Sequence, residues 1–400
     1  MKKFFLILYI FILSIIPVKA IELPIEITGE AAIVYNLDSN QIIYEKNPDI
    51  PYPLASLTKI MNAYTVINNV ENLDKKITIT YNDLYNLWGY TQAGLNIGDK
   101  LSYTDLLYAM MLPSGADASQ ALAYNTSTTT EEFVALMNKE AKELGLRNAT
   151  FADSYGGNDN NIATAREILR LTKECLKNDT FNKIFKTTSK TLSNGLQVTN
   201  YTRSIATFHG YNSDYITGSK SGFTQAAGLN LVSTVKVNDT NYLIVILKCN
   251  INEYTSQHVI DTYEVINYLE SKEFETRTII KNGTKIKRIP VERSTISEYV
   301  VYADQDIKVT LPVEDFNNLK IDYNIADKIL TSYVPGDNLG YIDIKLNDET
   351  LASYNVYLQD QIYTLAEVPR NIIIVILVSF FAIIIIFISN TFNRNKKKKK

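Results

Sequence analysis

The stretch P53-L-A-S-L-T-K-I-M-N62 has a serine three residues before a lysine, at the start of an apolar run with helical periodicity. Residues three apart share one face of a helix, so the amine of Lys59 could reach the hydroxyl of Ser56. The structural alternative is that Ser56 caps the helix and Lys59 is a solvated side chain of its first turn. Two other segments of the chain bear on the choice.

These two segments have a similar character. M111-L-P-S-G-A-D-A-S-Q120 carries a second serine, Ser114, at a predicted helix start, and T217-G-S-K-S-G-F-T224 carries Lys220 just before a predicted strand. Taken in order, S-L-T-K, S-G-A and K-S-G resemble S-x-x-K, S-x-N and K-T/S-G, the three signature elements of penicillin-recognising serine enzymes. The first motif often arises by chance, whereas the ordered set is a strong signal.

The residues around these motifs narrow the resemblance. The stretches A31-A-I-V-Y35, L144-G-L-R-N-A-T-F151, T164-A-R-E-I168 and K220-S-G-F-T-Q-A-A-G228 are similar to the low-molecular-weight penicillin-binding proteins, in particular the serine-type D-Ala-D-Ala carboxypeptidases. The resemblance covers nearly the whole chain after the first 20 residues. It implies an α+β fold: a penicillin-binding/β-lactamase-like domain, with a helical cluster on an antiparallel sheet, then a small all-β domain and a C-terminal transmembrane helix.

The resemblance also implies the chemistry of acyl transfer. Ser56 would be the nucleophile that attacks the carbonyl between two D-alanines, Lys59 the proton acceptor and Ser114 the proton relay to the leaving amine. The residues implied in substrate binding are Lys220, Ser221, Gly222, Phe223 and Thr224. The backbone N–H groups of Ser56 and Phe223 would hold the oxyanion, and the hydroxyls of Ser221 and Thr224 would bind the terminal carboxylate. No metal and no cofactor are expected.

Three positions need separate comment. The second motif of the family usually ends in asparagine, whereas this chain has Ala116, and Asp117 is one residue off and would point elsewhere on a helix. Glu167 could suggest the deacylating base of a β-lactamase, but the helical periodicity around it favours a surface carboxylate. Arg203 precedes the K-S-G motif and is a weaker candidate for binding the substrate carboxylate.

The two ends of the chain predict export and anchoring. Residues 1–20 have two early lysines, an apolar run shorter than the ~20 residues a bilayer needs, and small residues before a cleavage site after Ala20, which is typical of a signal peptide. Residues 371–390 are uncharged and long enough for a transmembrane helix, and the basic tail 391–400 would stay in the cytoplasm. We therefore expect the catalytic domain to be extracellular, on a single C-terminal span in the cell membrane.

The pattern between these ends predicts two domains. Residues 21–275 combine short β segments with helices expected at 56–68, 102–111, 114–124, 131–144, 164–176 and 257–269. Residues 276–367 change to period-2 segments separated by turns, which indicates a small antiparallel β domain. This β domain holds no cluster of candidate catalytic groups, so we expect a spacer or an interaction module.

Composition excludes several other functions. The formal net charge of −3 becomes about −12 without the lysines and arginine of the two ends, which argues against nucleic-acid binding. His209 and His258 are the only histidines and have no metal-ligand spacing, and no G-x-S-x-G elbow is present. Cys175 and Cys249 are interpreted as inert small residues rather than a disulfide or a nucleophile.

The expected partners are the pentapeptide stems of peptidoglycan, β-lactam antibiotics as covalent inhibitors, and the cytoplasmic membrane. Oligomeric state has no signal in the sequence. Two alternatives stay open: a β-lactamase, and a non-catalytic β-lactam-binding or wall-binding ectodomain in which Ala116 marks lost turnover. The extra β domain and the anchor argue against the first. The short cytoplasmic tail argues against a sensor.

Overall fold

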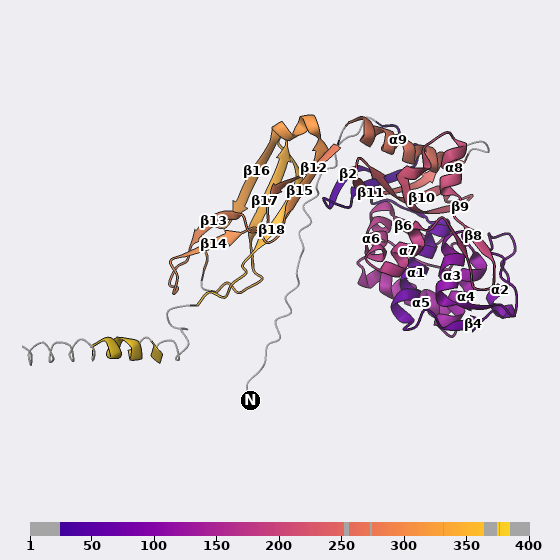
Figure 1. Ribbon diagram of the computed structural model, residues 1–400, viewed down its shortest axis with the longest axis horizontal. Helices are drawn as coiled ribbons and strands as arrows, with labels where there is room; N and C mark the ends of the chain where they lie inside the picture. The colour runs from indigo at the N-terminus through magenta and orange to yellow at the C-terminus, as the bar shows by residue number, and fades with distance from the viewer. Residues whose placement is uncertain are drawn as a thin grey trace, which may run out of the picture. The chain divides into compact units, whose positions relative to one another are not determined.

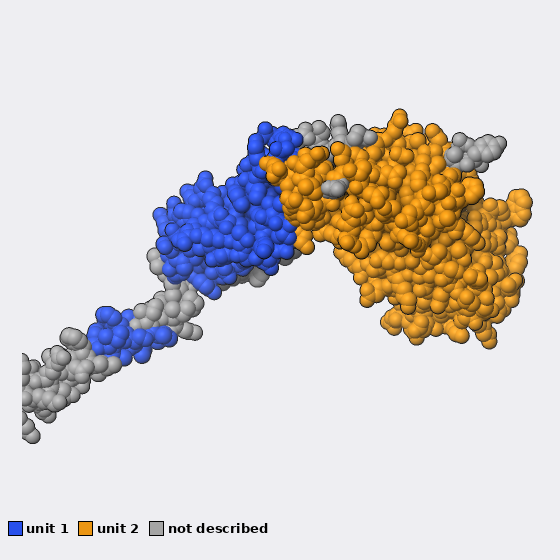
Figure 2. All heavy atoms as spheres, turned by 45° about the horizontal axis from the view of Figure 1, so that its top comes forward, with its two compact units in different colours: residues 1–17, 278–307, 318–400 blue, residues 18–277, 308–317 orange. Residues whose placement is uncertain are grey.

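The computed structural model describes residues 25–251, 256–272, 274–330, 332–363, 374–375 and 377–384. The chain divides into two compact units, coloured orange and blue in Figure 2. The larger unit comprises Val18–Arg277 and Lys308–Asn317, and the smaller one includes Thr278–Ile307 and the chain from Asn318 onward.

The larger unit is built on a five-stranded antiparallel sheet in the order β2-β1-β11-β10-β9. The strands are β1 (Ala31–Asn36), β2 (Gln41–Lys46), β9 (Ile216–Thr224), β10 (Gly228–Val237) and β11 (Thr240–Cys249). The hairpin between β10 and β11 turns at Asn238 and Asp239, both with positive φ, as a two-residue hairpin loop requires. The K-S-G motif lies on β9, which is an edge strand of this sheet.

This sheet is covered on both faces, and the strand residues alternate between two cores. Ala31, Ile33 and Tyr35 of β1 pack with the main helical cluster, whereas Ala32 and Val34 pack on the other side. Successive side chains of a strand point to opposite faces, so an entirely buried β1 requires a layer on each side. Because both faces of the sheet are covered, the central strands consist of nearly continuous apolar residues.

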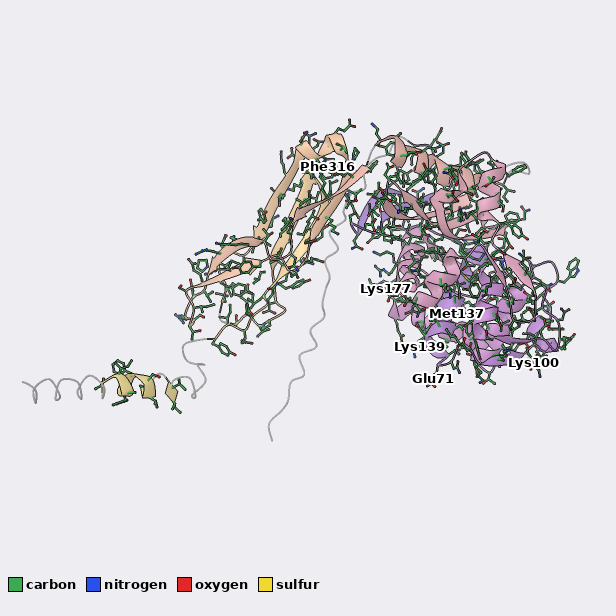
Figure 3. The ribbon with its side chains drawn as sticks, viewed as in Figure 1. Glu71, Lys100, Met137, Lys139, Lys177 and Phe316 are labelled. Carbon is green, nitrogen blue, oxygen red and sulfur yellow. The ribbon has the colours of Figure 1, made fainter. Side chains whose placement is uncertain are left out.

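Helices supply the two layers (Figure 1). The first layer contains α1 (Thr58–Asn69), α3 (Tyr103–Met111), α4 (Ala116–Thr126), α5 (Thr130–Glu143), α6 (Ala165–Leu176) and α7 (Asp179–Lys186). The second contains α8 (Thr202–Phe208) and α9 (Gln257–Ser271). Met137 of α5 is buried inside the first layer, while Glu71 and Lys100 lie at its outer edge (Figure 3).

Short elements connect these layers. They are β3 (Pro51–Pro53) with β6 (Ile162–Thr164), β4 (Lys76–Thr78) with β5 (Lys100–Ser102), β7 (Ser189–Thr191) with β8 (Gln197–Thr199), the turn helices η1 (Ala55–Leu57) and η2 (Ser213–Tyr215), and α2 (Tyr81–Leu84). The predicted helices are found within a few residues of their expected ends. The short helices α2, α7 and α8 were not predicted.

The described residues between 274 and 363 form strands and one 3₁₀ turn and contain no α-helix, in agreement with the period-2 pattern. Its elements are β12 (Phe274–Ile280), β13 (Lys285–Pro290), β14 (Glu298–Tyr302), β15 (Ile307–Pro312), η3 (Val313–Asn318), β16 (Leu319–Ile325), β17 (Asn338–Leu346) and β18 (Glu349–Tyr357). Within the smaller unit, β13 pairs with β14, and β16, β17 and β18 form an antiparallel sheet.

Across the described parts of the chain, none of the helices has both the length and the apolar character needed to cross a bilayer. The predicted signal segment 1–20 and basic tail 391–400 lie outside the described residues, as does half of the predicted span 371–390.

Candidate active site

Ser56 lies in η1, immediately before α1. The N-cap positions of η1 and α1 are Leu54 and Leu57, and neither helix receives a side-chain cap. Ala55, directly before the serine, has a φ of +48°, in the left-handed region that non-glycine residues seldom occupy. Such backbone strain costs about 1–3 kcal/mol and clusters at functional sites. The helix-cap alternative for Ser56 is therefore wrong.

The amine of Lys59 meets the serine hydroxyl, as the motif predicted. Its Nζ lies 3.0 Å from Ser56 Oγ and donates to the carbonyl oxygen of Tyr155 at 2.6 Å. The side chain is buried, and this burial lowers the pKa of Lys59 to about 7, although the charges of Asp153 and Asp117 act in the opposite direction. An amine with such a pKa is substantially neutral near pH 7, which a proton acceptor requires.

Lys220 and Ser114 form a second lysine–serine pair. Lys220 Nζ donates to Ser114 Oγ at 2.9 Å and to the carbonyl oxygen of Ser221 at 2.7 Å. Burial, and then the charge of Lys59, hold the pKa of Lys220 well below its usual range.

Ser114 does not cap a helix either. The N-cap of α4 is Gly115, which makes no side-chain cap, and Ser114 itself has a φ of +67°. Among the non-glycine residues with a left-handed conformation, Ala55 lies next to the first motif and Ser114 lies within the second. The conformation of Ser114 is compatible with a hydroxyl directed at Lys220 rather than along the helix axis.

Gly222 brings the edge strand β9 against the nucleophile's turn. A Cβ on Gly222 would lie 2.7 Å from Leu54 O and 3.0 Å from the backbone nitrogen of Ser56. Only glycine permits this approach of two backbones. The backbone before Phe223 therefore runs beside the amide of Ser56, where two N–H groups can serve one oxyanion.

Residues 18–250 match the family described as D-alanyl-D-alanine carboxypeptidase, and residues 274–364 match the C-terminal domain of penicillin-binding protein 5. The chain belongs to the D-alanyl-D-alanine carboxypeptidase family. It is therefore an enzyme of the serine-type D-Ala-D-Ala carboxypeptidase class, and the predicted resemblance is confirmed.

Individual relatives agree with this membership. The carboxypeptidase is 29% identical over 358 residues to D-alanyl-D-alanine carboxypeptidase DacC of Escherichia coli, covering 83% of this chain and 84% of the relative. It is 26% identical over 335 residues to D-alanyl-D-alanine carboxypeptidase DacF of Bacillus subtilis, covering 81% and 83%. Penicillin-binding protein 5 of Haemophilus influenzae has the same fold, with a TM-score of 0.74 at 22% identity over 86% of this chain and 99% of that one. The predicted combination of a penicillin-binding domain and a β domain is confirmed.

A loop organised by Asp153 carries the carbonyl that Lys59 contacts. The Asp153 carboxylate accepts from the backbone N–H groups of Tyr155, Gly156 and Asn158 at 2.9, 2.5 and 2.6 Å. Gly156 has a φ of +87°, and a Cβ there would lie 1.9 Å from Ala55 O. The loop is thus pressed against the residue before the nucleophile. Asp153 was not predicted from the sequence, because its role depends on backbone groups that leave no sequence pattern.

Two buried asparagines of the carboxypeptidase hold the nucleophile's surroundings and were also missed. Asn230 of β10 donates to Pro53 O and Leu54 O, which fixes the strand before Ser56 on the sheet. Asn62, on α1, donates to Ser119 Oγ at 2.9 Å and to Ser154 O at 3.0 Å. Asn62 follows Lys59 by three residues, so helical spacing was an available signal for it.

The position of the family asparagine is occupied by the buried methyl group of Ala116. The neighbouring Asp117 accepts from the backbone N–H groups of Ala93, Gly94 and Leu95. The Asp117 carboxylate therefore binds another loop and does not take the role of the family asparagine, as expected. The second hydrogen bond of Lys59 goes to the Tyr155 carbonyl instead.

The remaining candidates of the K-S-G strand differ in their surroundings. Thr224 Oγ1 donates to Asp159 Oδ1 at 2.9 Å, so it must turn from this carboxylate to bind another. Ser221 is half-buried, and the Phe223 side chain is exposed. Arg203 pairs with Asp214 at the surface, on α8.

Glu167 and the cysteines have structural roles. Glu167 is only 7% exposed, so the expectation of a surface carboxylate was wrong. Its carboxylate closes a capping box with Thr164 and accepts from the N–H of Asn148. Cys175 and Cys249 are free and buried, as expected for inert residues. The described residues contain no His, Cys, Asp and Glu cluster suited to a metal ion.

Proposed function

We propose that this enzyme removes the terminal D-alanine from peptidoglycan pentapeptide stems through an acyl-enzyme on Ser56. The observation that carries the proposal is the buried amine of Lys59, 3.0 Å from Ser56 Oγ and with a pKa lowered to about 7. A serine hydroxyl is a weak nucleophile until a neighbouring base takes its proton. Here the base is already in hydrogen-bond contact with it.

Acylation proceeds in two proton transfers. Neutral Lys59 takes the proton of Ser56 Oγ while this oxygen bonds to the carbonyl carbon between the two D-alanines, and the carbonyl oxygen becomes an oxyanion. The backbone N–H groups of Ser56 and Phe223 stabilise this charge, each such donor contributing roughly 3–4 kcal/mol. The carbon–nitrogen bond then breaks, and the departing amine takes a proton through Ser114.

Lys220 supports both the proton relay and substrate binding. It donates to Ser114 Oγ, so it orients this hydroxyl for the proton transfer. Such positioned transfer contributes about 10²–10⁴-fold to a rate. The substrate's terminal carboxylate is bound by the hydroxyls of Ser221 and Thr224, with Lys220 close by.

Deacylation uses the same base. Once the proton that Lys59 took from Ser56 has passed through Ser114 to the departing amine, the lysine is neutral again. It then takes a proton from a water molecule that attacks the ester carbon, and it returns this proton to Ser56 Oγ as the bond to that oxygen breaks. The products are the shortened stem and the free serine. The Tyr155 carbonyl keeps the lysine oriented in both steps, which supplies one function of the missing asparagine.

β-Lactams acylate the same serine. Their strained amide takes the place of the peptide bond, and their carboxylate takes the place of the terminal D-alanine carboxylate. The adduct forms by the same attack of Ser56 Oγ.

The sequence supports a location for this activity. We propose a signal peptide at 1–20, the peptidase domain at 21–275, the β domain at 276–367, a membrane span at 371–390 and a cytoplasmic tail at 391–400. The uncharged apolar segment and the terminal lysines support this arrangement. The catalytic domain then faces the cell wall.

The test is release of D-alanine from diacetyl-Lys-D-Ala-D-Ala by the purified full chain, together with labelling by a fluorescent penicillin. Both are expected in the native chain and both are expected to disappear in Ser56→Ala. Labelling without D-alanine release would favour the non-catalytic alternative. Rapid penicillin turnover without accumulation of the adduct would favour the β-lactamase.

A further inference from the structure

An uncharged loop rich in exposed aromatic residues follows α2. This aromatic loop, residues 84–98, contains no Asp, Glu, Lys or Arg. Trp88 is 94% exposed and Tyr85 58% exposed, and Tyr90 is also exposed. Asn86 lies between these aromatics, and Gln92 and Asn96 follow them in the loop. Large exposed aromatic groups without a structural role mark an interaction surface.

Hydrogen bonds hold the backbone of the loop in place, so the exposure of its aromatic side chains is a feature of an ordered segment. Helix α4, which begins after Ser114, supplies the contacts. Gln120 donates to the carbonyl oxygens of Asn82 and Tyr85 at 2.9 and 3.0 Å. Asp117, which is buried, accepts from three successive N–H groups at residues 93–95. Leu87 is buried beneath the loop while its neighbour Trp88 points out.

The aromatic loop is continuous with the active site. The ring of Tyr90 packs edge-on against that of Tyr155, with 5.0 Å between the ring centroids. Tyr155 is the residue whose carbonyl accepts from Lys59. On the other side, a Cβ on Gly115 would lie 2.9 Å from the Cβ of Ala93, so the loop also adjoins the S-G-A motif. The aromatic loop therefore adjoins the active site through Tyr90 and Ala93.

We infer that the aromatic loop binds the sugar chain to which the peptide stem is attached. This inference rests on the proposed function, because a peptide stem that reaches Ser56 brings the attached sugar polymer close to the aromatic loop. Flat aromatic faces present apolar area to the C–H faces of pyranose rings, and the Tyr hydroxyl remains available for hydrogen bonding. The Asn and Gln amides each supply donors and an acceptor for sugar hydroxyl and acetamido groups.

The composition favours this occupant over a lipid surface. Segments that bind anionic membranes combine aromatic residues with Lys and Arg, because each cation near the surface adds electrostatic attraction. The aromatic loop has no cation over its whole length. A neutral polymer rich in hydroxyl groups matches a neutral surface of aromatics and amides.

Trp88 provides a specific probe, because it is the only tryptophan of the chain. We expect its fluorescence, initially that of a water-exposed indole, to shift to the blue when peptide-free glycan strands are added to the full chain carrying Ser56→Ala. Diacetyl-Lys-D-Ala-D-Ala alone should leave the emission unchanged. Tyr85→Ala should weaken glycan binding about tenfold, in line with the loss of one stacking contact.

Kinetics provide the second test. Trp88→Ala should lower kcat/KM about tenfold for a pentapeptide attached to glycan and leave kcat/KM for the bare peptide within about twofold. The matched control is Phe208→Ala, which removes another aromatic of 83% exposure, on α8. It should alter neither value.

Three outcomes would overturn the inference. Equal losses on both substrates would mean that the loop only shapes the cleft, and no loss on either would mean that it binds no sugar. A blue shift on reconstitution into anionic vesicles, without a response to glycan, would identify a membrane surface. Glycan binding without D-alanine release from any substrate would support the surface and instead contradict the proposed activity.

Discussion

At the residue scale, burial turns Lys59 from a cation into a base. Its amine is enclosed and makes hydrogen bonds to Ser56 Oγ and Tyr155 O, one of which is a neutral carbonyl. Asp153 and Asp117 act in favour of the charged form, yet desolvation prevails and the pKa falls to about 7. The enzyme thus has a neutral amine next to the nucleophile at ordinary pH.

A pH dependence follows from this value. Only the neutral amine can accept a proton, and the neutral fraction rises with pH through a pKa of about 7. We therefore expect the rate of acylation by a fluorescent penicillin to increase from about pH 5 and to level off by about pH 8. A rate that falls over this range would contradict the assignment of Lys59 as the base.

Replacing the amine by a guanidinium tests the same residue differently. Lys59→Arg keeps the positive charge at every accessible pH, so it cannot act as a base. We expect a folded chain, judged by thermal unfolding, with acylation reduced by at least about 10²-fold. Acylation at the native rate would exclude Lys59 from the proton transfer.

Asp153 is expected to be a positioning residue. Asp153→Asn removes a charge that raises the pKa of Lys59, so the acylation–pH profile should move to lower pH, and the loss of one acceptor should also reduce the plateau rate. Asp74→Asn, at the surface, is the control and should change neither. A reduced plateau at an unchanged midpoint would indicate a purely structural role.

At the element scale, the site depends on the fit between the edge strand β9 and the turn η1. Asn230 of β10 donates hydrogen bonds to the carbonyl oxygens of Pro53 and Leu54. Gly222 allows β9 to pack closely against the turn η1 that follows them. The oxyanion donors proposed at Ser56 and Phe223 are therefore positioned by backbone packing between two elements that are far apart in sequence.

Gly222→Ala tests this packing. The added methyl group would meet Leu54 O and the nitrogen of Ser56, and must push β9 away from η1. Since one oxyanion donor is worth about 10²–10³-fold in related acyl transfer, we expect a loss of that order in the acylation rate. β9 is an edge strand, so the melting temperature should fall by only a few degrees. An unchanged rate would exclude the proposed oxyanion site.

The elements that could be predicted from the sequence are those that leave a local signal in it. The long helices have apolar periodicity, and two of them begin with capping boxes, at Ser102 and Thr164, so local sequence sufficed. Helix α8 has seven residues and no side-chain cap, and its sequence gave no comparable signal. The three motifs were found because their side chains carry the chemistry. The role of the Tyr155 carbonyl was not predicted. Every residue has a carbonyl, and only the tertiary fold determines which one accepts from Lys59.

At the scale of the whole molecule, this chain matches the D-alanyl-D-alanine carboxypeptidase family over residues 18–250 and the C-terminal domain of penicillin-binding protein 5 over residues 274–364. The candidate catalytic residues all lie between Ser56 and Thr224, within the larger unit. Residues 276–367 hold no cluster of such groups. The chemistry is therefore expected to be independent of the C-terminal part, whose proposed task is to hold the enzyme at the membrane.

Truncation separates these two tasks. A chain that ends at residue 367 lacks both the uncharged segment 371–390 and the terminal lysines, which supply the apolar transfer energy and the orientation of a membrane span. We expect it to be recovered in the medium, whereas the full chain sediments with membranes. Its kcat/KM for diacetyl-Lys-D-Ala-D-Ala should match that of the full chain, because the lysine–serine pairs are unaltered. Sedimentation of the truncated chain with membranes would show that another part of the molecule provides the attachment.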